Sequence, residues 1–204
     1  TYYIRRNAKP EKKIELRLAV NAGSVQENDN QLGLAHFMEH MGFNGSKNFP
    51  KNELVDFLQK TGVDFGADLN AYTSFDETVY ILSLPTEDAG MVDKGFTVLE
   101  DWAFNNLLDK TEIEKERGVV LEESRLSKGS WERMSRQYFP KLLNGSKYAD
   151  RLPIGKDDIL KNFKYETLKN FYTSWYRPNL MAVIVVGDID PADAEKKIIA
   201  HFSK

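Results

Sequence analysis

Two histidines and a glutamate lie close together in the segment His36-Phe37-Met38-Glu39-His40. On a helix, which turns by about 100° per residue, His36, Glu39 and His40 share one sector. Residues four positions apart stand one turn apart, so both imidazoles can bind one metal ion while the glutamate reaches a water molecule beside it. The spacing predicts a metal site with an acid–base group. The alternative is a surface helix that carries two histidines by chance.

A third ligand is needed, because a catalytic zinc ion usually has three protein ligands and a water. The sequence contains no cysteine, so a carboxylate or a histidine must supply it. A helix predicted from Thr111 carries Glu116 and Glu123 on one side. Apolar residues flank them there: Ile113, Val119, Val120 and Leu126. Buried carboxylates normally meet a charge, a donor or a metal, so both glutamates are candidates unless this stripe is shallow and they are solvated.

The composition excludes several other classes of function. The 204 residues are 41% hydrophobic and carry a net charge of −3, which is ordinary for a globular domain and unlike a protein that binds nucleic acid or anionic membranes. The absence of cysteine removes disulfides, thiolate metal sites and cysteine nucleophiles. The longest apolar run, residues 180–186, is too short for a transmembrane segment. The third histidine, His201, is interpreted as structural because it suits the last turn of a predicted helix.

Periodicity predicts the elements that must position these residues. Alternating apolar residues predict a half-buried strand over residues 14–20, and an unbroken apolar run predicts a buried central strand over residues 180–186. Two further strand-like runs, residues 69–74 and 78–84, are expected to pair as a hairpin. Helices are predicted over residues 31–41, 50–61, 86–104, 111–126, 165–175 and 191–202. Asp29 or Asn30 is expected to cap the first of these helices, Pro50 to be the first residue of the second, and Thr86 to start the third. The fourth is expected to start with a Thr111–Glu114 capping box, and the last with Asp190 followed by Pro191. Residues 131–155 are irregular in pattern and compatible with short helices. The expected fold class is α+β, with helices packed on a largely antiparallel or mixed sheet.

Four segments, in order along the chain, resemble the pitrilysin and insulinase family of zinc metallopeptidases, the inverzincins, whose motif is HxxEH. The metal-helix segment of that family is similar to HFMEHMGFNGSKNFP, and its substrate-strand segment to LNAYTSFDETVY. Its third-ligand helix is similar to EKERGVVLEESR, and its closing strand to WYRPNLMAVIVVGDID. Together they cover most of the chain from Ile14 to Pro191. The resemblance implies an inverzincin-type metallohydrolase domain.

The resemblance also implies roles for individual residues. One zinc ion would be bound by His36, His40 and Glu123, with Glu39 as the catalytic general base. The implied activity is that of a zinc-dependent endopeptidase acting on peptides or small unfolded polypeptides. Glu39 would deprotonate a metal-activated water and return a proton to the leaving amine.

Three further residues receive roles from the same resemblance. Glu116 would orient a metal ligand from behind. Asn70 and Ala71 would bind substrate on an edge strand, where a peptide adds its backbone as a further strand.

The resemblance extends to the organisation of the whole protein. Residues 1–204 are expected to form a single peptidase domain that carries the metal site, as a fragment of a longer multi-domain chain. A homologous C-terminal half or a second subunit would close a chamber around the peptide substrate, so the isolated domain would be weakly active or inactive. No nucleic acid and no transmembrane segment are expected. Resemblance to bacterial forms favours the periplasm or cell envelope over the cytoplasm.

Two other functions fit parts of the pattern. S-ribosylhomocysteine lyases also use an HxxEH helix, but they depend on cysteine, which this chain lacks. The chain could also be a non-catalytic zinc-binding or partner half of a processing peptidase, although such a scaffold has no need to keep Glu39. A Glu39→Gln variant separates these functions, because the peptidase requires that carboxylate.

Overall fold

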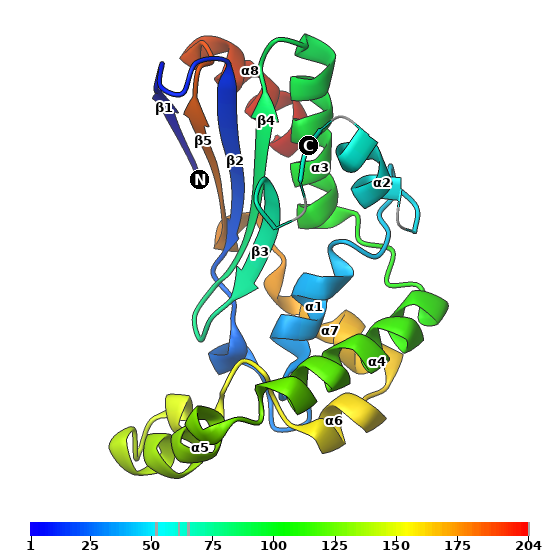
Figure 1. Cartoon of the computed structure of the whole chain (residues 1–204), viewed down its shortest axis with the longest axis vertical. Coiled ribbons are helices and arrows are strands. Elements are labelled where there is room, and N and C mark those ends of the chain that lie inside the picture. Colours follow the sequence, from blue (N-terminus) through cyan, green and yellow to red (C-terminus); the bar gives the residue numbers. More distant parts are fainter. Residues whose placement is uncertain (52, 61, 65, 204) are drawn as a thin grey trace.

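The computed structural model describes residues 1–51, 53–60, 62–64 and 66–203. In this part of the chain, five strands form one sheet in the order β1-β5-β2-β4-β3 (Figure 1). The strands are β1 (Tyr2–Arg6), β2 (Lys13–Val20), β3 (Leu69–Thr73), β4 (Thr78–Pro85) and β5 (Met181–Gly187). β1 runs parallel to β5, and all the other neighbours are antiparallel. The predicted α+β class with a mixed sheet is therefore confirmed.

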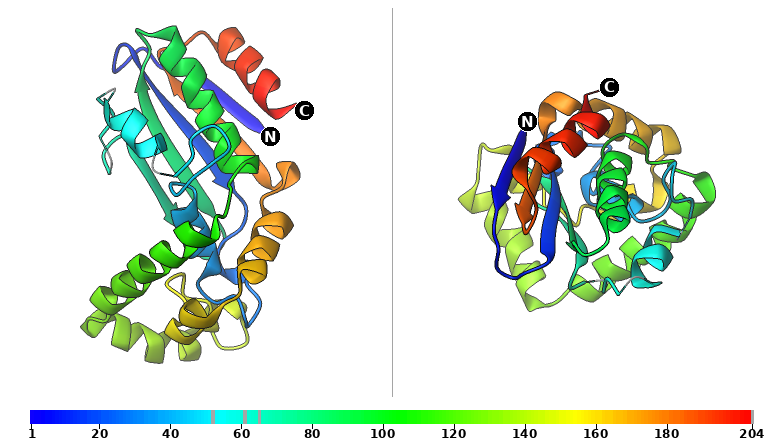
Figure 2. Two further views of the ribbon diagram at one scale, coloured as in Figure 1. Left: turned by 90° about the vertical axis from the view of Figure 1, so that its right-hand side faces the viewer. Right: turned by 90° about the horizontal axis from the view of Figure 1, so that it is seen from above.

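Helices complete the fold and lie mainly on one side of the sheet and below it (Figure 2). They are α1 (Leu34–Met41), α2 (Glu53–Lys60), α3 (Ala89–Phe104), α4 (Lys110–Ser127), α5 (Ser130–Leu142), α6 (Asp157–Asn162), α7 (Tyr165–Trp175) and α8 (Pro191–Phe202). None of these helices, within the described residues, has the length and apolar character needed to cross a membrane.

The strand β2 shows how the sequence pattern produces a one-sided sheet. Its apolar residues Ile14, Leu16 and Leu18 are buried, while the residues between them are only partly buried on the other face. Gly95 lets α3 approach closely, because a Cβ there would lie 2.8 Å from Leu16 Cδ1 and 2.4 Å from Leu84 Cδ1. The strand predicted from alternation is confirmed, and so is the 69–84 hairpin.

Several predicted helix starts are wrong, because local caps were misassigned. The cap of α1 is Gly33 rather than Asp29 or Asn30, and α3 begins after Asp88 rather than at Thr86. The cap of α4 is Asp109, whose carboxylate accepts bonds from Thr111 N and Glu112 N, so Thr111 lies inside the helix.

The helix predicted from Pro50 is represented by α2 over Glu53–Lys60; Asn52 and Thr61, which belong to that prediction, lie outside the described residues. The start of α8 at Pro191 after Asp190 is confirmed.

Among the strands and α-helices of the described residues, β1 and α6 were not predicted. The irregular segment, which was expected to hold only short helices, contains α5. Ser135 is the buried residue of α5, while Trp131, Met134 and Tyr138 are exposed at helical spacing. That spacing was a usable signal, although Pro140 inside the helix weakened it.

Candidate metal centre

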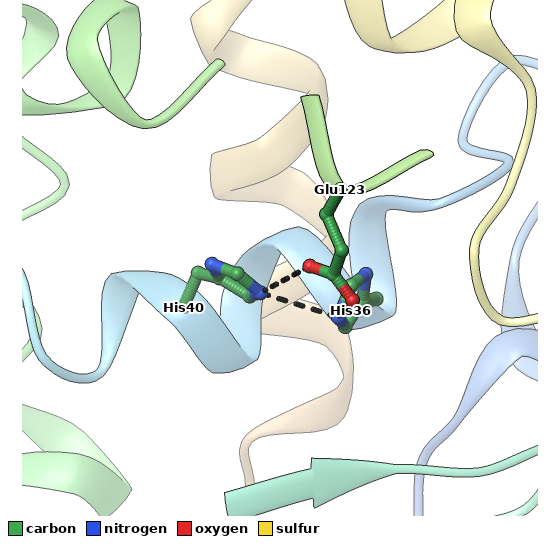
Figure 3. A group of neighbouring side chains, drawn as sticks. All are labelled: His36, His40 and Glu123. Carbon is green, nitrogen blue, oxygen red and sulfur yellow. Dashed lines mark hydrogen bonds and ion pairs between the residues drawn. The ribbon is translucent and has the colours of Figure 1, made fainter. Parts of the chain in front are cut away.

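The helix α1 presents its polar edge to a space between α4 and β3. Phe37, Met38 and Met41 are fully buried in the core, which fixes how the helix is rotated. The opposite edge carries His36 and His40, whose side chains point toward α4 (Figure 3). The apolar packing of α1 therefore aims both imidazoles in one direction.

Glu123 reaches the two histidines from α4. Its Oε2 lies 3.4 Å from His40 Nε2 and its Oε1 lies 3.7 Å from His36 Nε2. The two Nε2 atoms are 3.2 Å apart, and the three potential ligand atoms all lie within 4.8 Å of one another. The structure thus brings together the three residues named as ligands in the sequence.

This set of atoms fits a zinc ion. Two imidazole nitrogens and one carboxylate form a donor set known from catalytic zinc sites. Ligands about 2.1 Å from one tetrahedral ion stand about 3.4 Å apart, which is close to the separations seen here. The Glu123 side chain is 48% exposed, so one side of the site is open to water or substrate.

The charges around the histidines decide where a proton lies in the metal-free protein. Burial, together with the neighbouring His40, lowers the pKa of His36 to about 4. Burial would also lower the pKa of His40, but hydrogen bonds to Glu116 and Glu123 outweigh it and raise the pKa to about 10. The hydrogen bond with His40 holds the pKa of Glu123 below its usual value. The proton on His40 Nε2, the nitrogen that faces Glu123, must leave before a metal ion can bind there.

Glu116 supports His40 from behind. Its Oε1 lies 2.7 Å from His40 Nδ1, and its side chain is only 12% exposed. A carboxylate at this nitrogen fixes the tautomer and leaves Nε2 free to bind a metal. Asn44 donates to the other oxygen of Glu116 at 2.8 Å. His36 differs, since its Nδ1 is buried and has no hydrogen-bond partner among the described residues.

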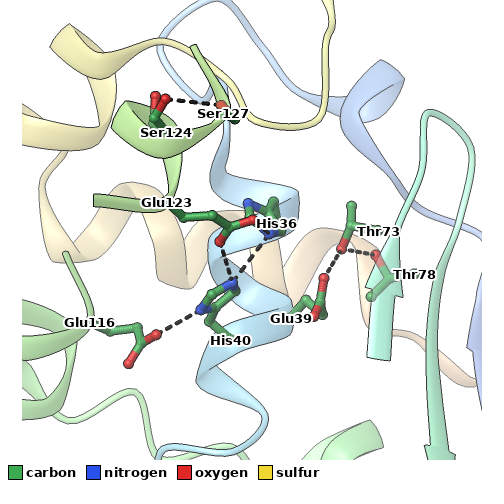
Figure 4. Close-up of polar contacts among 9 residues, drawn as sticks. All are labelled: His36, Glu39, His40, Thr73, Thr78, Glu116, Glu123, Ser124 and Ser127. Carbon is green, nitrogen blue, oxygen red and sulfur yellow. Dashed lines mark hydrogen bonds and ion pairs between the residues drawn. The ribbon is translucent and has the colours of Figure 1, made fainter. Parts of the chain in front are cut away.

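Glu39 lies beside the ligand atoms and is largely buried (Figure 4). Its Oε2 accepts a hydrogen bond of 2.9 Å from Thr73 Oγ1 on β3. Burial raises the pKa of Glu39, and the Thr73 hydroxyl partly opposes that shift. Sequence reasoning missed Thr73, although it lies in the LNAYTSFDETVY segment, two positions after Ala71.

Asn70 and Ala71 lie on β3, an edge strand that contacts α1. The Ala71 N–H donates to Asn70 Oδ1 at 2.9 Å, so the Asn70 side chain covers a backbone donor. A pocket of about 400 Å³ joins this strand to His36, Glu39 and Glu123. A second pocket, of about 430 Å³, is lined by both strand residues and by Glu39.

The start of α1 is held by a carboxylate that the sequence pattern did not indicate. The fully buried Glu27 accepts hydrogen bonds from Gly33 N at 3.0 Å and Ala35 N at 2.8 Å, as a cap would. Burial raises its pKa to about 8, although these N–H groups and the charge of Arg151 oppose the shift. Arg151 donates to the Glu27 carbonyl and to Asp29.

The segment after Arg151 forms one wall of the site. Pro153 and Ile154 line the pocket that contains the three candidate ligand residues. Gly155 touches the backbone of Gly33, where a Cβ on Gly155 would lie 2.3 Å from Gly33 Cα. The wall and the start of the histidine helix are therefore in direct backbone contact.

The sequence model described as insulinase (peptidase family M16) matches residues 2–148, so the chain belongs to that family. A second model, described as the inactive domain of peptidase M16, matches residues 162–204. The family inferred from the sequence is thereby confirmed.

The chain is similar to proteins named as zinc proteases. It is 38% identical over 203 residues to the probable zinc protease PqqL of Haemophilus influenzae, and 41% identical over 203 residues to that of Escherichia coli. Each comparison covers 100% of this chain and 22% of the relative, so the chain spans about a fifth of their length. The crystal structure of the first half of the periplasmic protease PqqL from E. coli superimposes with a TM-score of 0.95 at 41% identity, covering 100% of this chain and 43% of that one.

Proposed function

We propose that the protein is a zinc-dependent endopeptidase of peptides or small unfolded polypeptides. His36, His40 and Glu123 hold the ion in this proposal, and Glu39 is the general base. The observation that carries it is the convergence of two imidazole nitrogens and one carboxylate within 4.8 Å, with Glu39 on the same helix edge. Membership of a peptidase family whose relatives are named zinc proteases supports the choice of metal and reaction.

Glu39 moves the proton in this reaction. A bound zinc ion supplies Lewis-acid polarisation of the scissile carbonyl and acidifies water, which no side chain of the site can do as well. Glu39 takes a proton from the attacking water as its oxygen bonds to the carbonyl carbon. It then gives that proton to the amine as the C–N bond breaks. Thr73 holds the carboxylate in place through its hydroxyl.

The edge strand β3 is the proposed substrate platform. An extended peptide can add to an open edge by backbone hydrogen bonds, which selects for unfolded chains more than for particular side chains. Asn70 and Ala71 lie on this edge beside the pocket that contains Glu39. The Asn70 side chain must release the Ala71 N–H before that group can bind a peptide.

We also propose that residues 1–204 are one peptidase domain of a longer multi-domain chain. The short coverage of the relatives supports this proposal. A homologous C-terminal half or second subunit would close the chamber over the open side of Glu123. The similar E. coli protein is described as periplasmic, which favours the periplasm or cell envelope for this protein as well.

A cleavage assay with a matched pair of variants tests the function. The zinc-loaded protein is incubated with a diverse pool of quenched fluorescent peptides, alongside Glu39→Gln and the exposed control Glu166→Gln. Glu39→Gln should keep its zinc and lose cleavage by roughly 10²–10⁴-fold, while Glu166→Gln cleaves normally. Equal cleavage by all three proteins would refute the mechanism. Bound zinc without any cleavage would favour the non-catalytic partner half.

A further inference from the structure

We propose that Asn44 is a positioning residue of the metal centre, which holds Glu116 in the orientation that fixes the His40 ring. This inference rests on the proposed function, because it assumes that His40 is a metal ligand. It assigns a role to a residue in the turn after α1 that contacts no metal ligand atom itself.

The contacts of Asn44 form a closed ring. Its Nδ2 donates to Glu116 Oε2 at 2.8 Å and to the His40 carbonyl at 3.0 Å. Glu116 Oε1 in turn lies 2.7 Å from Nδ1 of the same histidine. The backbone of His40, the amide of Asn44, the carboxylate of Glu116 and the imidazole of His40 are therefore joined in sequence. The ring ties α1 to α4, the helix that carries Glu123.

The chemistry of an amide suits this position. A carboxylate bound only through Oε1 can rotate about its terminal bond, and fixing Oε2 as well removes that freedom. A lysine or arginine could also fix Oε2, but its charge would pair with Glu116 and weaken the hold of that carboxylate on His40. The neutral amide of Asn44 supplies a donor and leaves the negative charge to the imidazole.

The two histidines differ in this respect. The Nδ1 of His36 has no hydrogen-bond partner among the described residues. Of the two histidines, His40 is therefore the one whose Nδ1 is held by a side chain, that of Glu116. Disturbing Asn44 should therefore change the metal geometry through His40. It should leave the packing of α1 on the core intact.

Metal binding to Asn44→Ala tests the proposal, with zinc and cobalt(II) as probes. Asn162→Ala is the matched control, because Asn162 Nδ2 also donates to the carbonyl four residues back, that of Asp158, at 2.8 Å. We expect Asn44→Ala to raise the zinc dissociation constant about three- to tenfold, less than the 10–100-fold typical of losing a direct partner. The visible spectrum of the cobalt form should shift. Asn162→Ala should stay within about twofold of the unmodified protein.

A double-mutant cycle separates positioning from a general effect on folding. In a Glu116→Ala background, Asn44→Ala should weaken zinc binding by less than about twofold, because its partner is gone. The same loss in both backgrounds would overturn the proposal. If Asn44→Ala does not fold, Asn44→Asp decides, because it keeps the shape but sets a second carboxylate against Glu116. Asn44→Asp should bind zinc more weakly than the unmodified protein, and unchanged binding would overturn the proposal.

Zinc binding by the unmodified protein separates a failure of the proposed metal centre from a failure of the proposed role of Asn44. If that protein fails to bind zinc, the metal centre itself is wrong, and the role of Asn44 is overturned with it. If it binds zinc tightly and Asn44→Ala binds equally well, only the role of Asn44 is overturned.

Discussion

A methyl group at Gly155 should displace the start of the histidine helix. Gly155 has a φ of +74°, and a Cβ there would lie 2.3 Å from Gly33 Cα and 2.6 Å from Leu32 O. Both contacts are with backbone, so no side chain can turn aside to make room. Gly33 is the cap of α1, and His36 lies in the first turn of that helix.

The size of the effect follows from these distances. Carbon atoms pack best at 3.5–4.0 Å, so the two segments must separate by about 1 Å. Zinc–ligand distances tolerate deviations of only about 0.2 Å. A displacement of His36 by about 1 Å should therefore weaken zinc binding by at least about tenfold. The left-handed backbone and the overpacking together should lower the free energy of unfolding by about 2–5 kcal/mol.

Gly145→Ala provides the control. Gly145 has a φ of +82°, but a Cβ there would meet nothing within 4 Å. This variant should lose only about 1–2 kcal/mol from the backbone conformation and keep its zinc affinity. Urea unfolding and chelator competition measure the two quantities. If Gly155→Ala matches Gly145→Ala in stability and binds zinc within twofold of the unmodified protein, Gly155 does not control the position of α1.

Two further predictions concern the hydrogen bonds around the site. Thr73→Val removes the donor to Glu39 and keeps the shape, so kcat should fall about tenfold with zinc affinity unchanged; steady-state kinetics and chelator competition check this, and an unchanged kcat would contradict it. Glu27 has its pKa raised from 4.5 to about 8 by burial, so its contribution to stability is complete below about pH 4.5 and is lost as the pH rises to 8. Urea unfolding across that range should show a decline that Glu27→Gln removes, and an equal decline in the variant would count against it.

The elements that were predicted correctly are those whose pattern reflects burial on one face. Ile14, Leu16 and Leu18 alternate because only one face of β2 meets the helices. β1 was missed because its five residues are exposed or half-buried, and pairing with β5 is what holds it in the sheet. The cap of α4 was placed two residues late, because Asp109 and Thr111 both suit that position and only the backbone conformation distinguishes them.

The residues of the candidate site also differ in whether their sequence spacing alone could place them together. His36, Glu39 and His40 are close in sequence, so helical spacing alone places them together. Glu116 and Glu123 could be named as candidates, but their distance from the histidines depends on how α4 crosses α1. Thr73 and Asn44 join the site through tertiary contacts with Glu39 and Glu116, and Glu27 caps the start of α1. No local pattern distinguishes them from other polar residues.

The position of β5 also bears on how quickly the protein folds. This strand lies between β1 and β2, with Val183 opposite Tyr2 and Met181 opposite Val20, so its partners are at the far end of the sequence. Closing so long a loop costs conformational entropy before the strand contacts form and offset that cost. Chains rich in such non-local pairs therefore fold slowly. The residues of the candidate metal centre all precede β5 along the chain. The slow step in forming the site is therefore expected to be the insertion of a strand that contributes no residue to it.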